Sequence, residues 1–313
     1  MSTRATASPS LALVKYWGKI PGGINIPATS SLAVTLDSLK TDTRVELNEQ
    51  DVVHINGKVQ ERGRFVPVFD EVRSVSGSEI HFRADSSNNF PTSAGLASSS
   101  SGLAALVAAC FSEARIGVSE RTLSRVARIG SGSASRAVFG GFTSFPRGSQ
   151  WARQVAPAEH WPTFRVVVAR ISAESKPVSS RDAMEHARST SPFYEAWLHH
   201  SATLMDEAED ALLGRDLEKL GDAMRASYLS MFSTMFSSRP PIVFWLPGSL
   251  EVMHRAADLR TQGVPVWETM DAGPQVKLVT DAEHLSAVME AVSDFEPMSS
   301  GPGDGVRIVQ EDE

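Results

Sequence analysis

Apolar and polar positions follow strand-like patterns through the first 90 residues. A continuous apolar run at residues 8–19 ends in two lysines that flank two aromatic side chains, which predicts a buried strand followed by a cationic rim. Alternation at residues 24–37 and 43–47 predicts two more strands, and residues 52–58 predict a hairpin that turns on Asn56-Gly57. The pattern further predicts a short helix at about 64–74 and a strand at 79–85.

After residue 101 the apolar residues recur at helical spacing instead. Residues 102–111 predict a helix, and Ser119 is a plausible N-cap for a second helix that runs to about Ile129. Strands followed by packed helices predict an α+β half. The stretch 146–160 is polar and is bounded by prolines, so we expect two domains, residues 1–160 and 161–313.

Strands and helices alternate in the second half, which predicts another α+β layer. The expected strands are 164–171, 242–246, 264–270, 275–280 and 306–309, and the expected helices are about 180–189, 193–213, 216–237, 249–261 and 281–292. A stripe of Met and aromatic residues from Met224 to Phe236 has helical spacing and is typical of a core. His199-His200 has no partner at metal-ligand spacing, so we interpret it as a solvated pair.

Composition narrows the classes of protein that remain. The chain has 313 residues, 42% of them hydrophobic and 21% charged, which are ordinary globular values. A net charge of −7 argues against a general nucleic-acid surface, so an anionic substrate would be held by a few local cations. The single cysteine, Cys110, falls in a predicted apolar helix and is interpreted as a core residue. Residues 1–7 lack an apolar signal core, and no run approaches a membrane span, so we expect a cytoplasmic protein.

Small residues at 89–101 lead directly into the predicted helix at 102–111. Free backbone N–H groups at a helix start favour anion binding. The spacing matches neither the Walker loop nor the dinucleotide fingerprint. On composition alone such a stretch is more often a linker, but linkers seldom end in an amphipathic helix.

A second Gly/Ser cluster at residues 130–141 contains its own cation, Arg136. An arginine can hold a carboxylate or a phosphate through two hydrogen bonds. A flexible loop with a solvated arginine is an equally good interpretation of this segment alone. Two anion sites would imply two phosphate-bearing ligands or one ligand with two anionic ends.

Five motifs together resemble the diphosphomevalonate decarboxylase family of the GHMP kinase superfamily, in the same order and at the same spacing. They are residues 15–19, 25–36, 89–99, 130–142 and 270–274. The resemblance covers nearly the whole chain. It implies an α+β GHMP-kinase-like fold with an N-terminal ribosomal-protein-S5-like half, a C-terminal ferredoxin-like half and an active site in the cleft between them.

The family uses ATP to phosphorylate the tertiary 3-hydroxyl of (R)-5-diphosphomevalonate, then expels phosphate and CO₂ to give isopentenyl diphosphate. By this resemblance Asp271 is the base or the orienting acceptor for the hydroxyl. Lys15 would lie beside Asp271 and the moving phosphoryl group, and Arg136 would grip the C1 carboxylate. The resemblance also implies a homodimer, and Mg²⁺ that arrives with the nucleotide, since we see no dedicated carboxylate cage and expect no metal site of the protein's own.

The remaining site residues follow from the same motifs. The expected substrate contacts, besides Arg136, are Tyr16, Trp17, Gly18, Lys19, Arg64, Ser131, Gly132, Ser133, Ala134, Ser135, Ser180 and Arg181. The expected ATP contacts are Pro91, Ser93, Ala94, Gly95, Leu96, Ala97, Ser98 and Ser99. For one of these substrate contacts, Arg73 is the alternative candidate to Arg64.

Two positions depart from the family pattern, because Ser10 and Gln275 stand where the family usually has asparagine. Both changes lie beside the pocket, so the exact substrate stays open. With two further hypotheses, a kinase and a binding protein, this leaves three alternatives to the decarboxylation of 5-diphosphomevalonate, although Asp271 and Arg136 argue against the kinase. The chain could decarboxylate 5-phosphomevalonate to isopentenyl phosphate, phosphorylate mevalonate at the 3-position without decarboxylation, or bind ligands on the same fold without catalysis.

Overall fold

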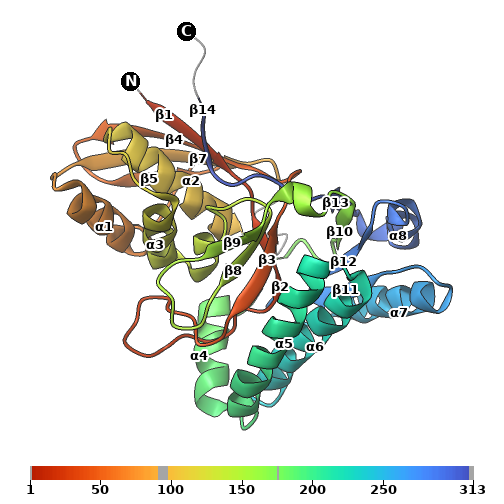
Figure 1. Cartoon of the computed structure of the whole chain (residues 1–313). Helices are drawn as coiled ribbons and strands as arrows, with labels where there is room; N and C mark the ends of the chain where they lie inside the picture. Colours follow the sequence, from red (N-terminus) through yellow and green to blue (C-terminus); the bar gives the residue numbers. More distant parts are fainter. Residues whose placement is uncertain (1, 91–97, 175, 310–313) are drawn as a thin grey trace.

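The structure is a computed structural model that describes residues 2–90, 98–174 and 176–309. In this part of the chain the strands form three sheets (Figure 1). The first sheet has the order β14-β1-β4-β7-β5-β6. Its strands are β1 (Thr3–Ala7), β4 (Thr41–Asn48), β5 (Val52–Ile55), β6 (Lys58–Val59), β7 (His81–Asn88) and β14 (Arg307–Val309).

Three helices pack on one face of the first sheet: α1 (Val66–Ser76), α2 (Ser98–Glu113) and α3 (Glu120–Gly130). Side chains alternate between the two faces of a strand, and this alternation places Ala5, Val45 and Ala84 on the face that the helices cover. Cys110 lies in the same core, as predicted. The hairpin of β5 and β6 is also confirmed: Asn56 and Gly57 both have positive φ, at 49° and 76°, as a tight hairpin turn requires.

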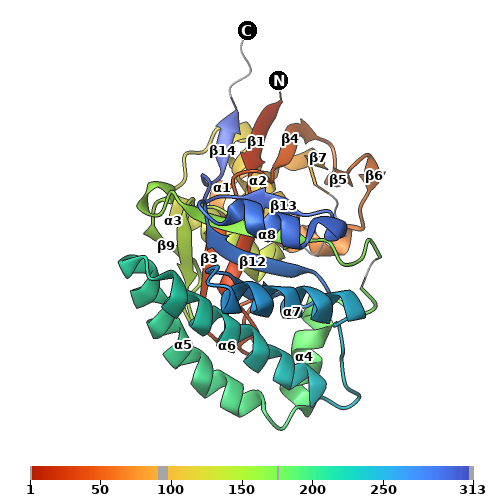
Figure 2. The same cartoon turned by 90° about the vertical axis from the view of Figure 1, so that its right-hand side faces the viewer.

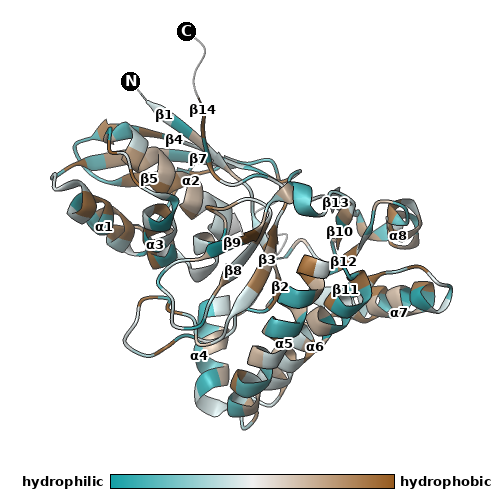
Figure 3. Cartoon of the chain, viewed as in Figure 1, coloured by the Kyte–Doolittle hydropathy of each residue, from teal (hydrophilic) through white to brown (hydrophobic). Residues whose placement is uncertain are grey.

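The second sheet lies between the two halves and has the order β2-β3-β8-β9. Its strands are β2 (Ser10–Val14), β3 (Ser31–Thr35), β8 (Phe142–Phe145) and β9 (Arg153–Ala156). Every residue of β2, β3 and β8 is buried, and Figure 3 shows the hydrophobic character of β3. Leu13, Leu32 and Phe142 share one hydrophobic cluster with Phe164 and Met224 of the second half. The two halves are therefore joined by a common core.

The third sheet has the order β11-β12-β10-β13, from β10 (Phe164–Ala169), β11 (Trp267–Met270), β12 (Val276–Asp281) and β13 (Met298–Ser300). The helices of the second half lie in front of this sheet and below it (Figure 2). They are α4 (Ser180–Thr190), α5 (Tyr194–Gly214), α6 (Leu217–Phe236), α7 (Pro247–Thr261) and α8 (Leu285–Ala291). The stripe on α6 is core, as predicted, except for the exposed Phe236, and His199-His200 is exposed. Among the described helices, none combines the length and apolar content needed to cross a membrane.

The chain returns to the first half after β13. Gly303 donates its backbone N–H to Thr35 O at 2.7 Å and accepts from Gly141 N at 2.8 Å. A Cβ on Gly303 would lie 2.6 Å from the Cα of Asp37, so only glycine fits this crossing. The following strand, β14, then pairs with β1. The domain boundary near residue 160 stays a prediction. The chain passes from the first half to the second near this residue and returns to the first half after β13.

Several predicted elements differ from those observed. The predicted strand at 242–246 is wrong: these residues form no regular element, because Phe244 and Trp245 pack into an aromatic core while Val243 is 63% exposed. Residues 24–30 form a loop in which Asn25 has a φ of 54°. Strands β1, β8, β9 and β13 are short and were not predicted. The helix predicted at 281–292 is the shorter α8.

Candidate active site

One carboxylate lies between two lysine ammonium groups at the junction of the second and third sheets. Asp271 directly follows β11, Lys15 directly follows β2, and Lys277 is the second residue of β12. Lys15 Nζ lies 3.0 Å from Asp271 Oδ1, and Lys277 Nζ lies 3.2 Å from Asp271 Oδ2. Both lysine side chains are 1% exposed, whereas that of Asp271 is 31% exposed. The carboxylate is thus the part of this cluster that a ligand can reach.

The lysines control the ionisation of Asp271. Burial opposes the charged form, but the ammonium groups of Lys15 and Lys277 outweigh it and hold the pKa of Asp271 well below its usual range. Burial also lowers the pKa of Lys15 to about 8, against the attraction of Asp271. Asp271 is therefore a carboxylate throughout the physiological pH range.

Lys15 is held by hydrogen bonds to β2 and to α6. Its Nζ donates to Ala12 O at 2.7 Å, and its backbone N–H donates to Ser227 Oγ of α6 at 3.0 Å. These bonds fix the lysine where the apolar strand β2 ends, which is the cationic rim that the sequence predicts.

Arg136 follows the 3₁₀ turn Gly132–Ser135 and is 2% exposed. Its Nε donates to Ser10 Oγ at 3.2 Å, and its Nη1 donates to Ser31 Oγ. Burial lowers its pKa to about 10, with Asp271 acting in the opposite direction, so the guanidinium keeps its charge at neutral pH. Arg136 and Asp271 thus belong to one electrostatic cluster.

Tyr16 packs directly on the second Gly/Ser cluster. A Cβ on Gly132 would lie 2.4 Å from the Tyr16 hydroxyl, and that hydroxyl donates to Asn25 O at 3.2 Å. Ser131 Oγ and Ser133 Oγ lie 3.1 Å apart and are partly exposed. Ser135 differs: its hydroxyl is buried and bonds to Ser124 Oγ at 2.7 Å. Ala134 is also fully buried, in the core of the first half.

The segment from Trp17 to Lys19 is fixed by α5 and α6. Trp17 Nε1 donates to Thr234 Oγ1 at 3.0 Å, and Trp197 Nε1 donates to Trp17 O at 2.9 Å. Gly18 has a φ of 110°, and a Cβ there would lie 2.1 Å from the Tyr194 hydroxyl. A side chain at position 18 would therefore displace the side chain of Tyr194, the first residue of α5.

The charge of Arg181 acts on two further cations, Lys19 and Arg64. Burial and the charge of Arg181 lower the pKa of Lys19 to about 8, and the same two causes lower the pKa of Arg64. Arg181 lies in the first turn of α4, beside Ser180, whose Oγ accepts from Lys176 Nζ. Cations that repel a common neighbour in this way suit a polyanionic ligand.

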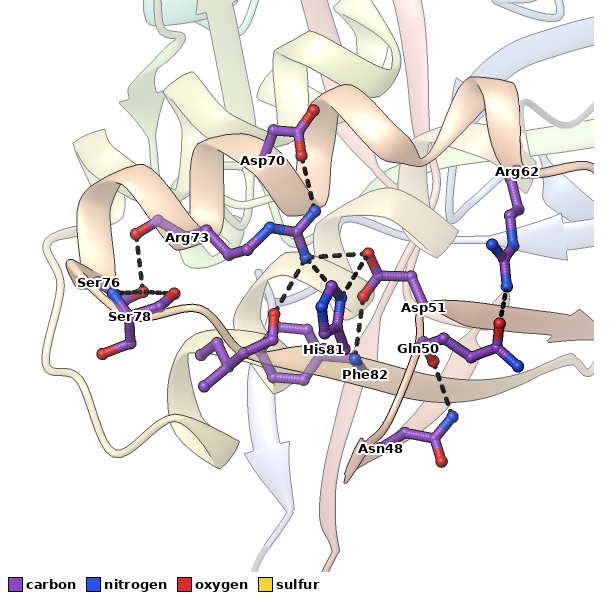
Figure 4. Close-up of polar contacts among 11 residues, drawn as sticks. Asn48, Gln50, Asp51, Arg62, Asp70, Arg73, Ser76, Ser78, His81 and Phe82 are labelled. Atoms are coloured by element: carbon purple, nitrogen blue, oxygen red, sulfur yellow. Dashed lines mark hydrogen bonds and ion pairs between the residues drawn. The ribbon is translucent and has the colours of Figure 1, made fainter.

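Arg73 belongs to a different network, shown in Figure 4. It bonds to Asp51 Oδ2 at 2.9 Å and to Asp70 Oδ1 at 2.7 Å, and its Nη1 also contacts the ring of His81. Because Arg73 already pairs with two carboxylates, the geometry favours Arg64 as the arginine available to a ligand.

Most of the predicted nucleotide loop lies outside the described residues, namely Pro91, Ser93, Ala94, Gly95, Leu96 and Ala97. Ser98 begins α2, and Ser99 is partly buried in its first turn. In that turn Ser100 Oγ accepts from the backbone N–H of Ser10 at 3.4 Å. The start of α2 therefore lies next to the serine that holds Arg136. Over the described residues, no group of three or more His, Cys, Asp or Glu side chains could hold a metal ion.

Sequence reasoning missed Lys277, Lys176 and the role of Gln275. Lys277 could have been noticed as a lone charge inside an apolar strand. Lys176 Nζ donates to Ala272 O at 2.9 Å, which brings a further cation beside Asp271. Gln275 is 1% exposed, accepts from Ile171 N at 2.6 Å through Oε1, and donates to Ser172 O at 2.6 Å through Nε2. No sequence signal distinguishes such a tether from a ligand contact.

The architecture is that of the GHMP kinase superfamily, as the motifs predict. Residues 7–156 match the model of the diphosphomevalonate decarboxylase-like N-terminal domain, and residues 166–310 match the mevalonate 5-diphosphate decarboxylase C-terminal domain. The chain therefore belongs to the diphosphomevalonate decarboxylase family.

Individual relatives agree with this assignment. A diphosphomevalonate decarboxylase from Ganoderma lucidum is 31% identical over 94% of this chain and 82% of its own length. The mevalonate diphosphate decarboxylase from Staphylococcus aureus is 34% identical in sequence. Its crystal structure superposes with a TM-score of 0.93 over 99% of this chain and 98% of that one. A structure of MDDEF in complex with MVAPP, AMPPCP and magnesium is 35% identical, with a TM-score of 0.92 over 99% of both chains.

Proposed function

We propose that this protein uses ATP to convert (R)-5-diphosphomevalonate to isopentenyl diphosphate, with release of ADP, phosphate and CO₂. The observation that carries the proposal is the ionised, partly exposed Asp271 between Lys15 and Lys277, in one electrostatic cluster with Arg136. Family membership supports the same reaction, since the similar MDDEF structure contains MVAPP and AMPPCP together with magnesium.

Asp271 would orient the 3-hydroxyl of the substrate. The hydroxyl would donate to the carboxylate while its oxygen forms a bond to the γ-phosphorus of ATP and the bond from that phosphorus to the bridging oxygen breaks as ADP leaves. The hydroxyl proton would pass by way of the carboxylate to solvent. Because the pKa of Asp271 is held far below neutrality, the role of orienting acceptor is favoured over that of a base that retains the proton. Lys15 would offset the negative charge that the transferring oxygens carry.

Arg136 would hold the C1 carboxylate that is lost as CO₂. Ser10 and Ser31 take two of its five N–H donors, so the fork can still bind a carboxylate. When the 3-phosphate departs with its bonding electrons, positive charge grows at C3, and the C1–C2 bond supplies the electrons of the new double bond as CO₂ leaves. Arg136 would hold the leaving carboxylate in place for that step.

The 5-diphosphate would bind the cations Lys19, Arg64 and Arg181, together with the hydroxyl groups of Ser180, Ser131, Ser133 and Tyr16. Five buried residues would support this pocket from behind: Trp17, Gly18, Gly132, Ala134 and Ser135. A set of three cations, in which Arg181 repels both Lys19 and Arg64, favours a diphosphate over the 5-phosphate of the alternative substrate. The two departures from the family pattern are both compensated, because Ser10 bonds Arg136 and Gln275 bonds the backbone at 171–172.

ATP would bind the loop at 91–97 and the start of α2 at Ser98 and Ser99, where a helix N-terminus favours phosphate. Mg²⁺ bound to the nucleotide would neutralise phosphate charge during transfer. The homodimer and the cytoplasmic location that the resemblance implies also remain proposals, which sedimentation and fractionation of the native protein would test.

Turnover with two substrates tests the proposed function. We expect ¹⁴CO₂, ADP and phosphate in equal amounts from ATP, Mg²⁺ and [1-¹⁴C]5-diphosphomevalonate, with much lower kcat/KM for 5-phosphomevalonate. Phosphoryl transfer without CO₂ would identify a 3-kinase instead. Preference for 5-phosphomevalonate would assign the alternative decarboxylase, and the absence of any ATP-dependent product would leave only a binding protein.

A further inference from the structure

Lys277 is a charged residue among buried apolar neighbours in its strand, β12. Its strand, β12, lies between β10 and β11, and Lys277 stands opposite Val168 on one side and Thr269 on the other. Val276, Leu278 and Val279 around it are 0% exposed, and Lys277 itself is 1% exposed. Burying an ammonium group in such a place is unfavourable unless an anion compensates for it.

The compensating anion is Asp271. Lys277 Nζ lies 3.2 Å from Oδ2, while Lys15 Nζ lies 3.0 Å from the other oxygen, Oδ1. Each carboxylate oxygen thus has one ammonium partner from a different sheet. Two opposed partners prevent rotation of the carboxylate about its Cβ–Cγ bond, which a single partner would allow.

We propose that Lys277 is a positioning residue for the reaction: by holding Oδ2 it fixes the plane of the Asp271 carboxylate, so that its exposed edge meets the substrate hydroxyl. The inference rests on the function proposed above. Lys277 itself touches no reacting atom, since it is buried behind the carboxylate.

The proposed role of Lys277 can be measured through the pKa of Asp271, because the surrounding charged groups set that pKa. Asp271 is influenced by Lys15 at the end of β2, Lys277 on β12, Arg136 after the 3₁₀ turn and Lys176 before α4. Lys277 lowers the pKa of Asp271 by attraction, and it lowers the pKa of Lys15 by repulsion. Removing its charge should therefore raise the pKa of both groups, which a residue that only fills space would not do.

The experiment compares Lys277→Met with wild type and with Lys219→Met. Lys219 is a matched control because it pairs with Asp216 at the surface and is 79% exposed. In Lys277→Met we expect kcat to fall by about 100-fold or more, the scale of a lost acid–base function, with KM for ATP and for 5-diphosphomevalonate changed less than about threefold. Lys277→Arg, which keeps the charge, should restore part of kcat, and Lys219→Met should match wild type.

A second readout is independent of catalysis. In ligand-free protein with ¹³C-labelled aspartate, the Asp271 carboxyl signal is assigned by its loss in Asp271→Asn. Its titration midpoint should be higher in Lys277→Met than in wild type. If Lys277→Met does not fold, Lys277→Gln, which keeps one hydrogen-bond donor, is measured in its place.

Two results would overturn the inference: kcat within threefold of wild type in the folded neutral variant, or an unchanged Asp271 midpoint. Failure of the proposed function would look different. Wild type would then release no CO₂ from 5-diphosphomevalonate, while the titration would still show whether Lys277 controls the ionisation of Asp271.

Discussion

At the scale of single residues, the site is a balance of buried charges around one carboxylate. Asp271, Lys15 and Arg136 come from distant parts of the chain and meet in one cluster. Their association was predictable because each lies in a motif shared with the family. Lys277 was not, since an alternating strand pattern does not say which buried position faces a carboxylate.

Replacing Asp271 with asparagine should separate binding from turnover. The amide keeps the shape of the side chain but loses the charge that we propose accepts the substrate hydroxyl. We expect ATP affinity to stay nearly unchanged and kcat to fall by several powers of ten, as steady-state kinetics and nucleotide titration would show. Asp210→Asn on the exposed surface of α5 is the control. Turnover close to wild type would remove Asp271 from the reaction.

The same substitution should alter the dependence of stability on pH. Because the pKa of Asp271 is lower in the folded protein than in the unfolded chain, its contribution is fully present above about pH 4 and is lost as the pH falls towards the folded-state pKa. Urea unfolding should show Asp271→Asn less stable by about 3–5 kcal/mol at pH 7, because two buried lysines lose their partner. This gap should narrow below pH 4. A gap that is constant down to pH 2.5 would contradict the ionisation argued here.

At the scale of elements, hydrogen bonds from the turn between β11 and β12 hold the segment that begins at residue 171 and leads into α4. Gln275 holds that segment at Ile171 and Ser172, and Lys176 returns to Ala272 O. The same segment leads to Ser180 and Arg181 at the start of α4. The turn that carries Asp271 therefore also positions groups proposed to bind the 5-diphosphate.

Gln275→Leu keeps the volume of the side chain but removes its hydrogen bonds. Buried backbone groups at 171–172 would lose their partners, so we expect a loss of about 1–3 kcal/mol in the free energy of unfolding. Hydrogen exchange at the amide of Ile171 should become faster, while amides in β4 should be unaffected. The shorter Gln275→Asn should have a smaller effect. Unchanged exchange at Ile171 in Gln275→Leu would show that the tether contributes nothing.

The sequence predicts some helices and strands better than others. The hairpin at Asn56-Gly57 and the long helices α5 and α6 were predictable from turn chemistry and from sustained helical spacing. Strands β8 and β9 were not, because four residues each carry little periodicity and gain their partners only in the tertiary fold. The apolar residues 242–246 resemble a strand but pack as an irregular segment.

At the scale of the whole molecule, the two halves are connected by more than one crossing of the chain. They share a core through the second sheet, and the segment 301–305 passes back between them. Glycine is required at this crossing because backbone from Asp37 and from Val138 to Gly140 approaches it closely. Because the site draws residues from both halves, its geometry depends on this crossing.

Gly303→Ala tests that dependence. The new Cβ would lie 2.6 Å from Asp37 Cα and 2.8 Å from Asp37 N, which are backbone atoms that cannot move aside freely. We expect a loss of about 1–3 kcal/mol in the free energy of unfolding, as for other overpacked positions, and a lower kcat. Gly117→Ala, where a Cβ meets nothing within 4 Å, should behave as wild type in the same denaturation and turnover assays. Equal stability of the two variants would contradict a tight crossing.

The first and last strands are neighbours in one sheet, with Arg4 opposite Val309. A peptide linker between these strands would need to span little more than one interstrand spacing, about 5 Å. A circularly permuted gene that opens the chain at the exposed turn near Gly57 would then encode every strand and helix in a new order of synthesis. Such a permutant would place a fusion partner at the far edge of the first sheet and leave the β1–β14 pairing covalently closed.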